Sequence, residues 1–450
     1  MDDGEPRSAA PLTAFAATFA AATCAAAGHV GADAHWLAAV GDAIVRTRAL
    51  PSSIVYAAAP SSWHDAPALG QLVFDGLVRL GGDRALVLAQ AVAVAVAFAA
   101  VAVDLRRRDA DDAAGAAVLI ALLVAAPASL LVVRAQLFSI ALFPVLLALL
   151  RHDAGWRSRR IWLCVPIIAL WANLHGAVLV GFAALAAYLV LDRARRAPLE
   201  SFAVLGASAA ALLATPALLD TPRYYSGVLH GEAAAERFGL WAPLDPGDPL
   251  DLLFLVGALV LLVLALRARP ALWELVLAAL FAAAAIEARR NGIWLLLLIA
   301  PHAARGLRRR RSVLGLVRPR LAAVCLAAPV ALAALSFARP PAHDGASDAL
   351  LGRAQSAAHG SPILADPLDA ERLALRGARI VIGNPLDAFE RERQKQYLAW
   401  LRGERAGDAL LRAPVRVVVV SRRSDAQRRL ALRGLRELAR DERAVVYLAR

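Results

Sequence analysis

The sequence predicts a polytopic α-helical membrane protein, with about eleven transmembrane helices and a small C-terminal α/β domain. Uncharged apolar runs such as 113–133 and 161–191 alternate with arginine clusters such as 106–108 and 308–311. Apolar runs of about twenty residues cross roughly 30 Å of hydrocarbon as helices, because backbone polar groups there must pair within the chain. After residue 341 the long apolar runs stop, which predicts a separate domain.

Composition agrees with this class. The 450 residues are 59% hydrophobic and 19% charged, with a mean hydropathy of +0.55, whereas soluble domains average about 25% charged residues. The net charge of +13 would indicate nucleic-acid binding in a soluble protein. In a membrane protein, arginines in short loops set orientation instead, so we expect membrane lipids and no nucleic acid as partners. Lys395 is the only lysine, and with the many alanines this indicates GC-rich, bacterial coding.

The cysteines carry no sign of a metal site or a disulfide. Cys24, Cys164 and Cys325 all lie in apolar runs, far apart and without metal-ligand spacing. We interpret them as small core residues.

The transmembrane domain is expected to cover residues 1–341. We place its spans at 11–30, 84–103, 113–133, 137–150, 161–173, 177–191, 202–218, 250–266, 270–286, 292–304 and 321–338. The run 161–191 is too long for one helix and is split at Asn173, His175 and Gly176. The first span lacks a basic start and a cleavage pattern, so we interpret it as retained.

Arginine counts orient this topology. With the N-terminus in the cytoplasm, the short inner loops carry nineteen arginines and the longer outer loops carry nine. We therefore expect a multi-pass protein of the bacterial inner membrane. The large loop 31–83 and the tail 342–450 would then both lie on the extracytoplasmic side.

The tail is expected to be an α/β domain. Strands are predicted at 361–365, 379–382, 415–420 and 444–449, and helices at 368–376, 387–402 and 424–440. No glycine-rich nucleotide motif follows any of the strands.

Unusual polar residues gather at the outer helix ends. Polar groups near membrane depth are costly unless they are paired or solvated, and each one alone is as well explained by a structural role. Together they are candidates for a site, because they share one face and one depth: Asp33, His35, Arg134, Gln136, Asn173, His175, Glu287, Arg289, Arg290 and Asn291.

Three segments resemble a largely uncharacterised bacterial family. They are residues 134–139 (Arg-Ala-Gln-Leu-Phe-Ser), residues 171–176 (Trp-Ala-Asn-Leu-His-Gly) and Arg290-Asn291, after an acidic first outer loop. The family is similar to the GT-C integral-membrane glycosyltransferases, which use polyprenyl-phosphate sugars, and the resemblance extends over the whole chain. It implies transfer of a sugar from a polyprenyl-phosphate donor to an envelope glycan or lipid acceptor on the extracytoplasmic face.

The chain departs from the family's pattern at four places. Ala135 replaces a proline, and Leu37 stands where a histidine usually follows Trp36. Pro67 stands where a glutamate is usual, with Asp65 nearby. Residues 383–385 (Gly-Asn-Pro) replace an Asp-Gly-Arg turn in the tail.

The resemblance implies roles for the candidate residues. A carboxylate of the first loop, Asp33 or less well Asp65, would accept the acceptor's hydroxyl proton or order a metal. Donor and phosphate binding would fall to Arg134, Gln136, Asn173, His175, Arg290 and Asn291, because guanidinium groups bind phosphate in a bidentate way. If a divalent ion takes part, carboxylate and phosphate oxygens suit Mg²⁺ or Mn²⁺, although no ligand cluster indicates a metal.

Two alternatives stay open at this stage. A transporter or flippase for a lipid-linked substrate would also have polar residues at its helix ends, although the sequence shows no convincing internal repeat. A non-catalytic envelope scaffold would depend on its tail and would tolerate loss of Asp33.

Overall fold

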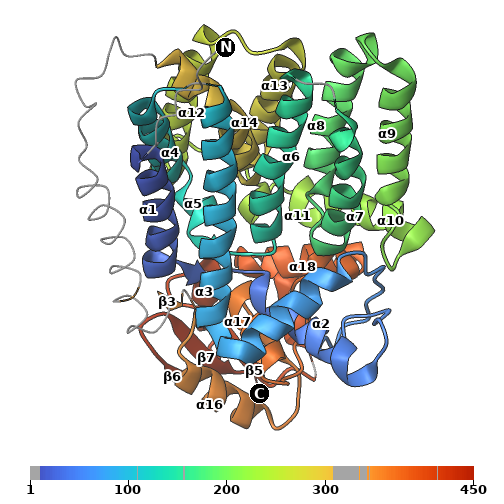
Figure 1. Cartoon of the computed structure of the whole chain (residues 1–450). Coiled ribbons are helices and arrows are strands. Elements are labelled where there is room, and N and C mark those ends of the chain that lie inside the picture. Colours follow the sequence, from blue (N-terminus) through green and yellow to red (C-terminus); the bar gives the residue numbers. More distant parts are fainter. Residues whose placement is uncertain are drawn as a thin grey trace, which may run out of the picture.

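The structure is a computed structural model. It describes residues 11–307, 334, 342, 343 and 345–449, apart from 109, 156, 157 and 413. Figure 1 shows a bundle of helices with a small domain of helices and strands against one end, which we call the domain end. Bundle helices finish at the opposite end near Arg107, Arg151, Arg267 and Arg305, and we call it the arginine end.

The bundle helices run between these two ends. They are α1 (Pro11–Ala27), α3 (Ala68–Arg107), α4 (Asp112–Ala125), α6 (Leu137–Gly155), α7 (Cys164–Leu174), α8 (Val178–Leu191), α9 (Pro198–Ala211), α12 (Pro249–Arg267), α13 (Leu272–Glu287) and α14 (Gly292–Gly306). Local chemistry explains several starts: the side chain of Asp111 accepts a hydrogen bond from the Ala114 backbone at 3.0 Å, and Asp248 caps α12 ahead of a proline at its first position.

The bundle presents an apolar surface. Leu259 on α12 is 63% exposed and Phe202 on α9 is 58% exposed, whereas Phe143, Trp171 and Trp294 fill the interior. Among the described residues, three helices are long and apolar enough to cross a membrane, namely α3, α6 and α12. Side chains of this kind are stable against lipid, so these surfaces are expected to face the bilayer.

The predicted spans from 11–30 to 292–304 all fall on apolar helical segments, with some corrections. The stretch 113–133 is α4, then α5 (Pro127–Leu130), then the short strand β2 (Val132–Val133), because Pro127 lacks the N–H that would continue α4. The last predicted span, 321–338, lies outside the described residues, so the number of about eleven spans stays a prediction. Cys24 and Cys164 are buried, and Cys325 also lies outside the described residues.

Helix α3 begins sixteen residues before the predicted span 84–103. Its first part, from Ala68, lies along the domain end, and a kink at Gly81 and Gly82 turns the chain into the bundle. Gly82 has φ +58°, a conformation that glycine adopts at little cost. The end of the predicted outer loop 31–83 is therefore helical from Ala68 and continuous with the transmembrane helix.

Short helices and strands cover the domain end. β1 (His29–Val30) pairs in parallel with β2 and with β3 (Ala342–His343). α2 (Ala34–Thr47) follows β1 and packs on the first part of α3. The segment between α9 and α12 contributes η3 (Leu218–Asp220), α10 (Thr221–His230), α11 (Glu232–Ala235) and η4 (Gly239–Trp241).

The C-terminal domain is built on a four-stranded sheet of order β4-β5-β7-β6. Its elements are α16 (Asp348–Ala358), β4 (Ile363–Ala365), α17 (Pro367–Leu375), η6 (Leu386–Ala388), α18 (Arg391–Leu401), η7 (Arg405–Leu411), β5 (Val417–Ser421), α19 (Asp425–Leu432), β6 (Arg436–Arg440) and β7 (Ala444–Leu448). β4 and β5 are parallel, and the other pairs are antiparallel.

The predicted helix 424–440 is wrong in its second half. α19 ends at Leu432, Gly434 has φ +68°, and the chain returns as β6 along β7. The charged residues of β6 resemble a solvated helix face in sequence, but they lie on an exposed edge strand, where charges are common.

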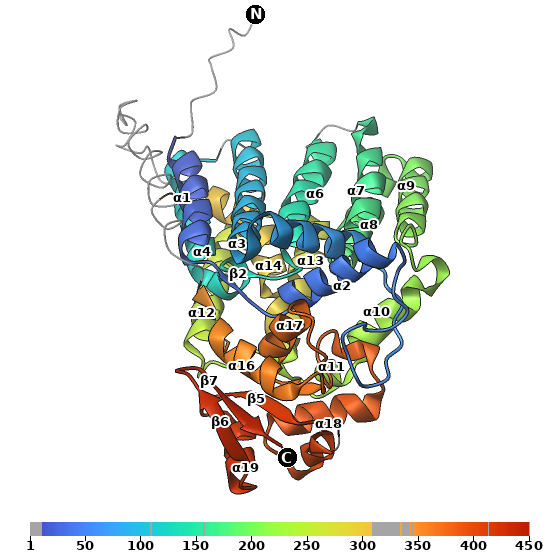
Figure 2. The same ribbon diagram turned by 90° about the horizontal axis from the view of Figure 1, so that it is seen from below.

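The first loop and the C-terminal domain form one body. The predicted strand 379–382 makes isolated bridges, in which Ile380 pairs with Ala57 of the loop and with Ile363 of β4. One hydrophobic core contains Trp36 and Trp63 together with the β5 valines. Figure 2 shows the sheet farthest from the bundle and α17 between the two, where α17 contacts α2.

Candidate active site

A cavity of about 180 Å³ lies between the domain end of the bundle and the C-terminal domain. Residues far apart in sequence line it: Asp33 and Trp36 of α2, His175 between α7 and α8, Tyr224 of α10, Trp241 of η4, Arg290 of η5 (Arg289–Asn291), and Asn384 and Asp387 of the domain. Of the eight residues proposed from sequence, Asp33, His175 and Arg290 line it.

Asp33 is held in an unusual conformation. It precedes α2 with φ +84°, and its side chain makes no capping bond to that helix. Its backbone N–H donates to both carboxyl oxygens of Glu371, at 3.0 and 2.9 Å. The indole Nε1–H of Trp36 donates to Asp33 Oδ1 at 3.2 Å, and the Trp36 ring meets the Trp63 ring edge-on at 5.7 Å. These contacts orient the Asp33 carboxylate at the cavity wall.

Glu371 is the residue through which the C-terminal domain holds Asp33. It lies on α17, is buried, and also accepts a hydrogen bond from Asn384 Nδ2 at 2.7 Å. Burial and, to a lesser extent, the nearby Asp33 charge raise the pKa of Glu371 to about 8. A neutral Glu371 can sit beside the Asp33 carboxylate without a second negative charge.

Arg290 brings a positive charge to the cavity wall. Its guanidinium lies over the Trp241 ring, 4.5 Å from the ring centroid, which is a cation–π contact. The neighbouring Arg289 instead lies near the α12 carboxylates Asp248 and Asp251, at 3.6 and 3.4 Å. Of the two adjacent arginines, only Arg290 lines the cavity.

His175 is oriented by a serine on a neighbouring helix. Its Nδ1 lies 2.7 Å from Ser139 Oγ of α6, and Ser139 Oγ also accepts a hydrogen bond from Trp171 Nε1 at 2.7 Å. Gly176 follows directly, and a Cβ added there would come 3.2 Å from the Tyr224 hydroxyl. The turn after α7 thus needs a small residue to bring His175 and α10 together.

Asn173 and Asn291 do not line the cavity; their side chains bind backbone carbonyls. Asn173 Nδ2 donates to the carbonyls of Ala169 and Ala214 at 2.8 and 2.6 Å, joining α7 to the segment after α9. Asn291 Nδ2 donates to Ala284 of α13 at 3.0 Å. In this structure both asparagines position the turns that carry His175 and Arg290.

Asp65, Arg134 and Gln136 also lie outside the cavity lining. Asp65 is buried, accepts a hydrogen bond from Gln71 Nε2 at 2.8 Å, and has its pKa raised to about 7 by burial. Arg134 follows β2 and lies beside Gly31, whereas its neighbour Ala135 reaches the cavity. Gln136 Nε2 lies 3.4 Å from the Arg290 carbonyl, so it supports the arginine turn.

Sequence reasoning missed Glu371, Asp387, Tyr224 and Trp241. Asp387 lines the cavity, and burial raises its pKa to about 6, with a further contribution from Asp33. Asp387 follows the segment 383–385, which stood in place of the family's tail motif and was the one available signal. Tyr224, Trp241 and Glu371 lie in segments that resemble ordinary amphipathic surface.

The cavity residues do not form a metal site of their own. Among the described residues, no group of three or more histidine, cysteine, aspartate or glutamate side chains is placed to hold an ion.

No protein-family model and no curated protein matches the sequence. Two solved structures are similar over 97% of the chain, each with a TM-score of 0.54. The first is ArnT from Cupriavidus metallidurans bound to undecaprenyl phosphate, at 14% identity over 96% of that chain. The second is the arabinofuranosyltransferase AftD from Mycobacteria, at 15% identity, of which the match covers 41%. Both are GT-C integral membrane glycosyltransferases.

The chain has the GT-C fold. This confirms the fold expected from the resemblance of the three sequence segments. All four departures from the family pattern lie in the wall of the cavity: the segment 383–385 lines it through Asn384 and Pro385, and Leu37, Pro67 and Ala135 line another part. Leu37, Pro67 and Ala135 add apolar side chains to the wall that the Trp36 and Trp63 rings also line.

Proposed function

We propose that the protein transfers a sugar from a polyprenyl-phosphate donor to a cell-envelope acceptor in the cavity at the domain end. The observation that carries this proposal is that Asp33 and Arg290, a carboxylate and a cation, line one cavity between an apolar bundle and a covering domain. A structure of the same fold is bound to undecaprenyl phosphate, which supports a lipid-phosphate donor for this chain.

In the proposed reaction, the acceptor hydroxyl loses its proton to Asp33 while its oxygen attacks the anomeric carbon of the donor sugar. The bond from that carbon to the phosphate oxygen breaks, and the phosphate leaves on its lipid with an additional negative charge. Arg290 stabilises that charge, because guanidinium hydrogen bonds to phosphate are strong and bidentate. The ring of His175, oriented by Ser139, binds the donor sugar or its phosphate.

Asp387 is the second carboxylate in the cavity. With a pKa raised to about 6, it holds its proton more readily than an exposed aspartate. We assign the base to Asp33, because the Trp36 indole N–H holds its carboxylate at the cavity wall, whereas burial raises the pKa of Asp387. Asp387 then donates or accepts a hydrogen bond at the sugar.

The proposal also assigns the orientation of the protein in the membrane. The domain end is extracytoplasmic and the arginine end is cytoplasmic, because arginines in short loops stay in the cytoplasm. The acceptor therefore meets the donor on the side of the envelope where finished glycans are assembled.

The test is sugar transfer by the purified full chain in lipid nanodiscs. Lipid-linked sugars and an envelope extract from cells lacking the protein serve as substrates, and release of polyprenyl phosphate is measured by mass spectrometry. Asp33→Asn should lower transfer at least about 100-fold by removing the general base. Asparagine tolerates positive φ and keeps the oxygen that Trp36 binds, so the local structure should persist.

The matched control is Asp42→Asn on the same helix. Asp42 forms surface ion pairs with Arg46 and Arg79, far from the cavity lining, and such pairs contribute little stability. This variant should transfer sugar at the wild-type rate. Wild-type transfer by Asp33→Asn would remove Asp33 as the base and overturn the mechanism.

A further inference from the structure

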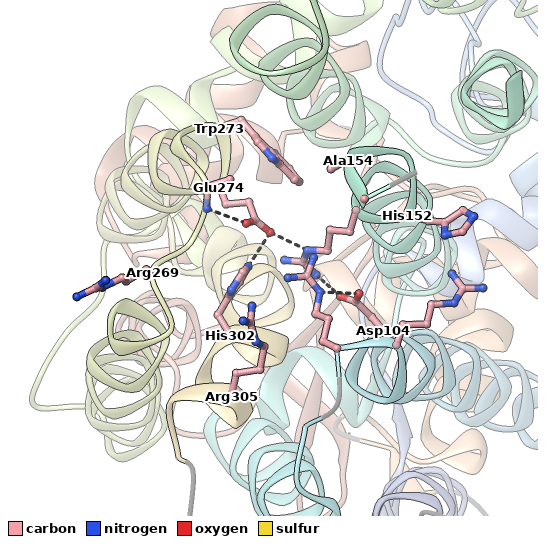
Figure 3. Close-up of a pocket in the computed structure, with 13 residues that line it drawn as sticks. Asp104, His152, Ala154, Arg269, Trp273, Glu274, His302 and Arg305 are labelled. Atoms are coloured by element: carbon pink, nitrogen blue, oxygen red, sulfur yellow. Dashed lines mark hydrogen bonds and ion pairs between the residues drawn. The ribbon is translucent and has the colours of Figure 1, made fainter. Parts of the chain in front are cut away.

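A second pocket lies at the arginine end, on the far side of the bundle from the candidate active site. Its volume is about 600 Å³, and it is enclosed by the ends of α3, α6, α13 and α14 and by the turn before α13. Figure 3 shows Asp104, Glu274, His302 and Arg305 gathered around its centre, whereas Arg269 and His152 point away from it.

The floor of the pocket is a buried network of ions. Arg151, with 3% of its side chain exposed, binds Asp104 at 2.9 Å and Glu274 at 2.8 Å, and donates to the Leu298 carbonyl at 2.6 Å. His302 lies 2.7 Å from the same Glu274 carboxylate. Charges removed from water are costly unless they are paired. The two carboxylates are therefore used in holding Arg151 and His302 in place.

The residues that line the pocket carry more positive than negative charge. Five arginines and two carboxylates line it, and one of the carboxylates also binds Arg108 at 2.9 Å. Within the part of the chain that the structure describes, Arg107 and Arg305 have no carboxylate partner. Arg305 is half-buried at the pocket, whereas Arg107 is exposed at its rim and Arg269 points away from its centre.

Two buried polar atoms at the pocket lack a partner. Arg305 Nε and His302 Nδ1 are closed off from solvent, and neither has a hydrogen-bond partner among the described residues. Unpaired buried polar groups cost free energy. The Arg305 Nε–H is a donor, so a bound anion that draws this side chain toward the pocket would gain a hydrogen bond from it, whereas His302 is engaged through Nε2 with Glu274. Both residues are on α14, one turn apart, and line the same pocket.

We propose that this pocket binds a phosphate-bearing anion. Arg107 and Arg305 line the pocket and have no carboxylate partner among the described residues, so their guanidinium groups are free to bind the acceptor oxygens of a phosphate. The pocket opens at the end of a bundle whose sides are apolar, so the phosphate can come from an anionic lipid headgroup or from a soluble phosphate compound. This site is independent of the sugar-transfer site.

The experiment measures binding to the full-length purified protein after delipidation. One arm compares phosphatidylglycerol with phosphatidylcholine by native mass spectrometry, and the other follows the thermal-unfolding shift with inorganic pyrophosphate. The variants are Arg305→Gln, Arg305→Lys and, as matched control, Arg267→Gln. Arg267 is exposed at the same end and is not part of the pocket lining.

Arg305→Gln should weaken binding at least about tenfold, since it removes a charged donor from the ligand. Arg305→Lys, which keeps the charge, should lose less, and Arg267→Gln should bind as the wild type does. Selective binding of phosphatidylglycerol alone would support a lipid headgroup, and a pyrophosphate shift would support a soluble phosphate. No preference in either arm, or equal weakening by Arg305→Gln and Arg267→Gln, would overturn the proposal.

Discussion

At the scale of single residues, the contact between Glu371 and Asp33 joins the C-terminal domain to the bundle's candidate base. Both oxygens of Glu371 accept from one backbone N–H, which holds Asp33 at a positive φ that costs on the order of 1 kcal/mol or more. Glu371 therefore acts on Asp33 as a positioning residue, without reaching the cavity lining.

Stability should depend on pH through Glu371. In the folded chain its pKa is raised to about 8, from a usual 4.5, so between these values the folded state binds a proton that the unfolded state has lost. The free energy of unfolding should then fall as pH rises through this window, by up to about 1.4 kcal/mol per pH unit for one proton. Asp387 and Asp65, also raised, act in the same direction at lower pH.

Glu371→Gln should remove this part of the pH dependence. The midpoint of thermal unfolding, measured from pH 5.5 to 8, should fall less steeply in the variant than in the wild type. Glu442→Gln, at an exposed turn of the same domain, should keep the wild-type slope. Equal slopes for wild type and Glu371→Gln would show that Glu371 is ionised in the folded protein throughout.

At the scale of elements, the approach of α3 to the end of α7 sets the position of His175. Gly70 lies where a Cβ would come 2.4 Å from the Leu174 carbonyl oxygen. Gly70→Ala should therefore push the two helices apart and destabilise the protein by about 1–3 kcal/mol. We also expect reduced sugar transfer, because His175 directly follows Leu174.

The same helix supplies the control. Gly76 has nothing within 4 Å of an added Cβ, so Gly76→Ala should leave activity intact and stabilise α3 by about 0.5–1 kcal/mol. Thermal unfolding and transfer rates of the two variants check this pair. A Gly70→Ala variant as stable and active as Gly76→Ala would contradict the close packing of α3 on α7.

Much of the element pattern could be predicted from the sequence, because it follows from local chemistry. Long apolar runs predicted the bundle helices, and the β-branched run of β5 predicted a strand of the domain. β6 could not be predicted, since its charged residues have no strand signal and its pairing with β7 depends on the turn near Asp441. The early start of α3 was not predicted, because Gly81 and Gly82 interrupt the helical sequence pattern just before the apolar run.

The candidate site was predictable only in part, because only some of its residues are unusual for their place in the sequence. Asp33, His175 and Arg290 stood out because polar residues at membrane depth are unusual. Glu371 lies in a charged domain where another acid carries no signal, and Asp387 was marked only by the neighbouring segment 383–385. Their role comes from the packing of α17 on α2 and of the segment 379–382 on the first loop, which only the fold reveals.

At the scale of the whole molecule, the first loop and the C-terminal domain share one core at one end of the bundle. The proposed topology places both outside the cytoplasm. Ser53→Cys and Glu404→Cys, at exposed positions of the loop and the domain, should react with a membrane-impermeant maleimide in intact spheroplasts. Arg195→Cys, at the arginine end, should react only after lysis. Labelling of Arg195→Cys in intact spheroplasts, with the other two protected, would reverse the topology.

The most direct measurement of the central claim compares lipid and glycan extracts, by mass spectrometry, from cells lacking the protein and complemented with wild type or with Asp33→Asn. The account predicts that cells without the protein, and cells with Asp33→Asn, accumulate a polyprenyl-phosphate sugar and lack one sugar on an envelope glycan or lipid, while the wild type restores both. Identical extracts from all three strains, or full restoration by Asp33→Asn, would contradict it.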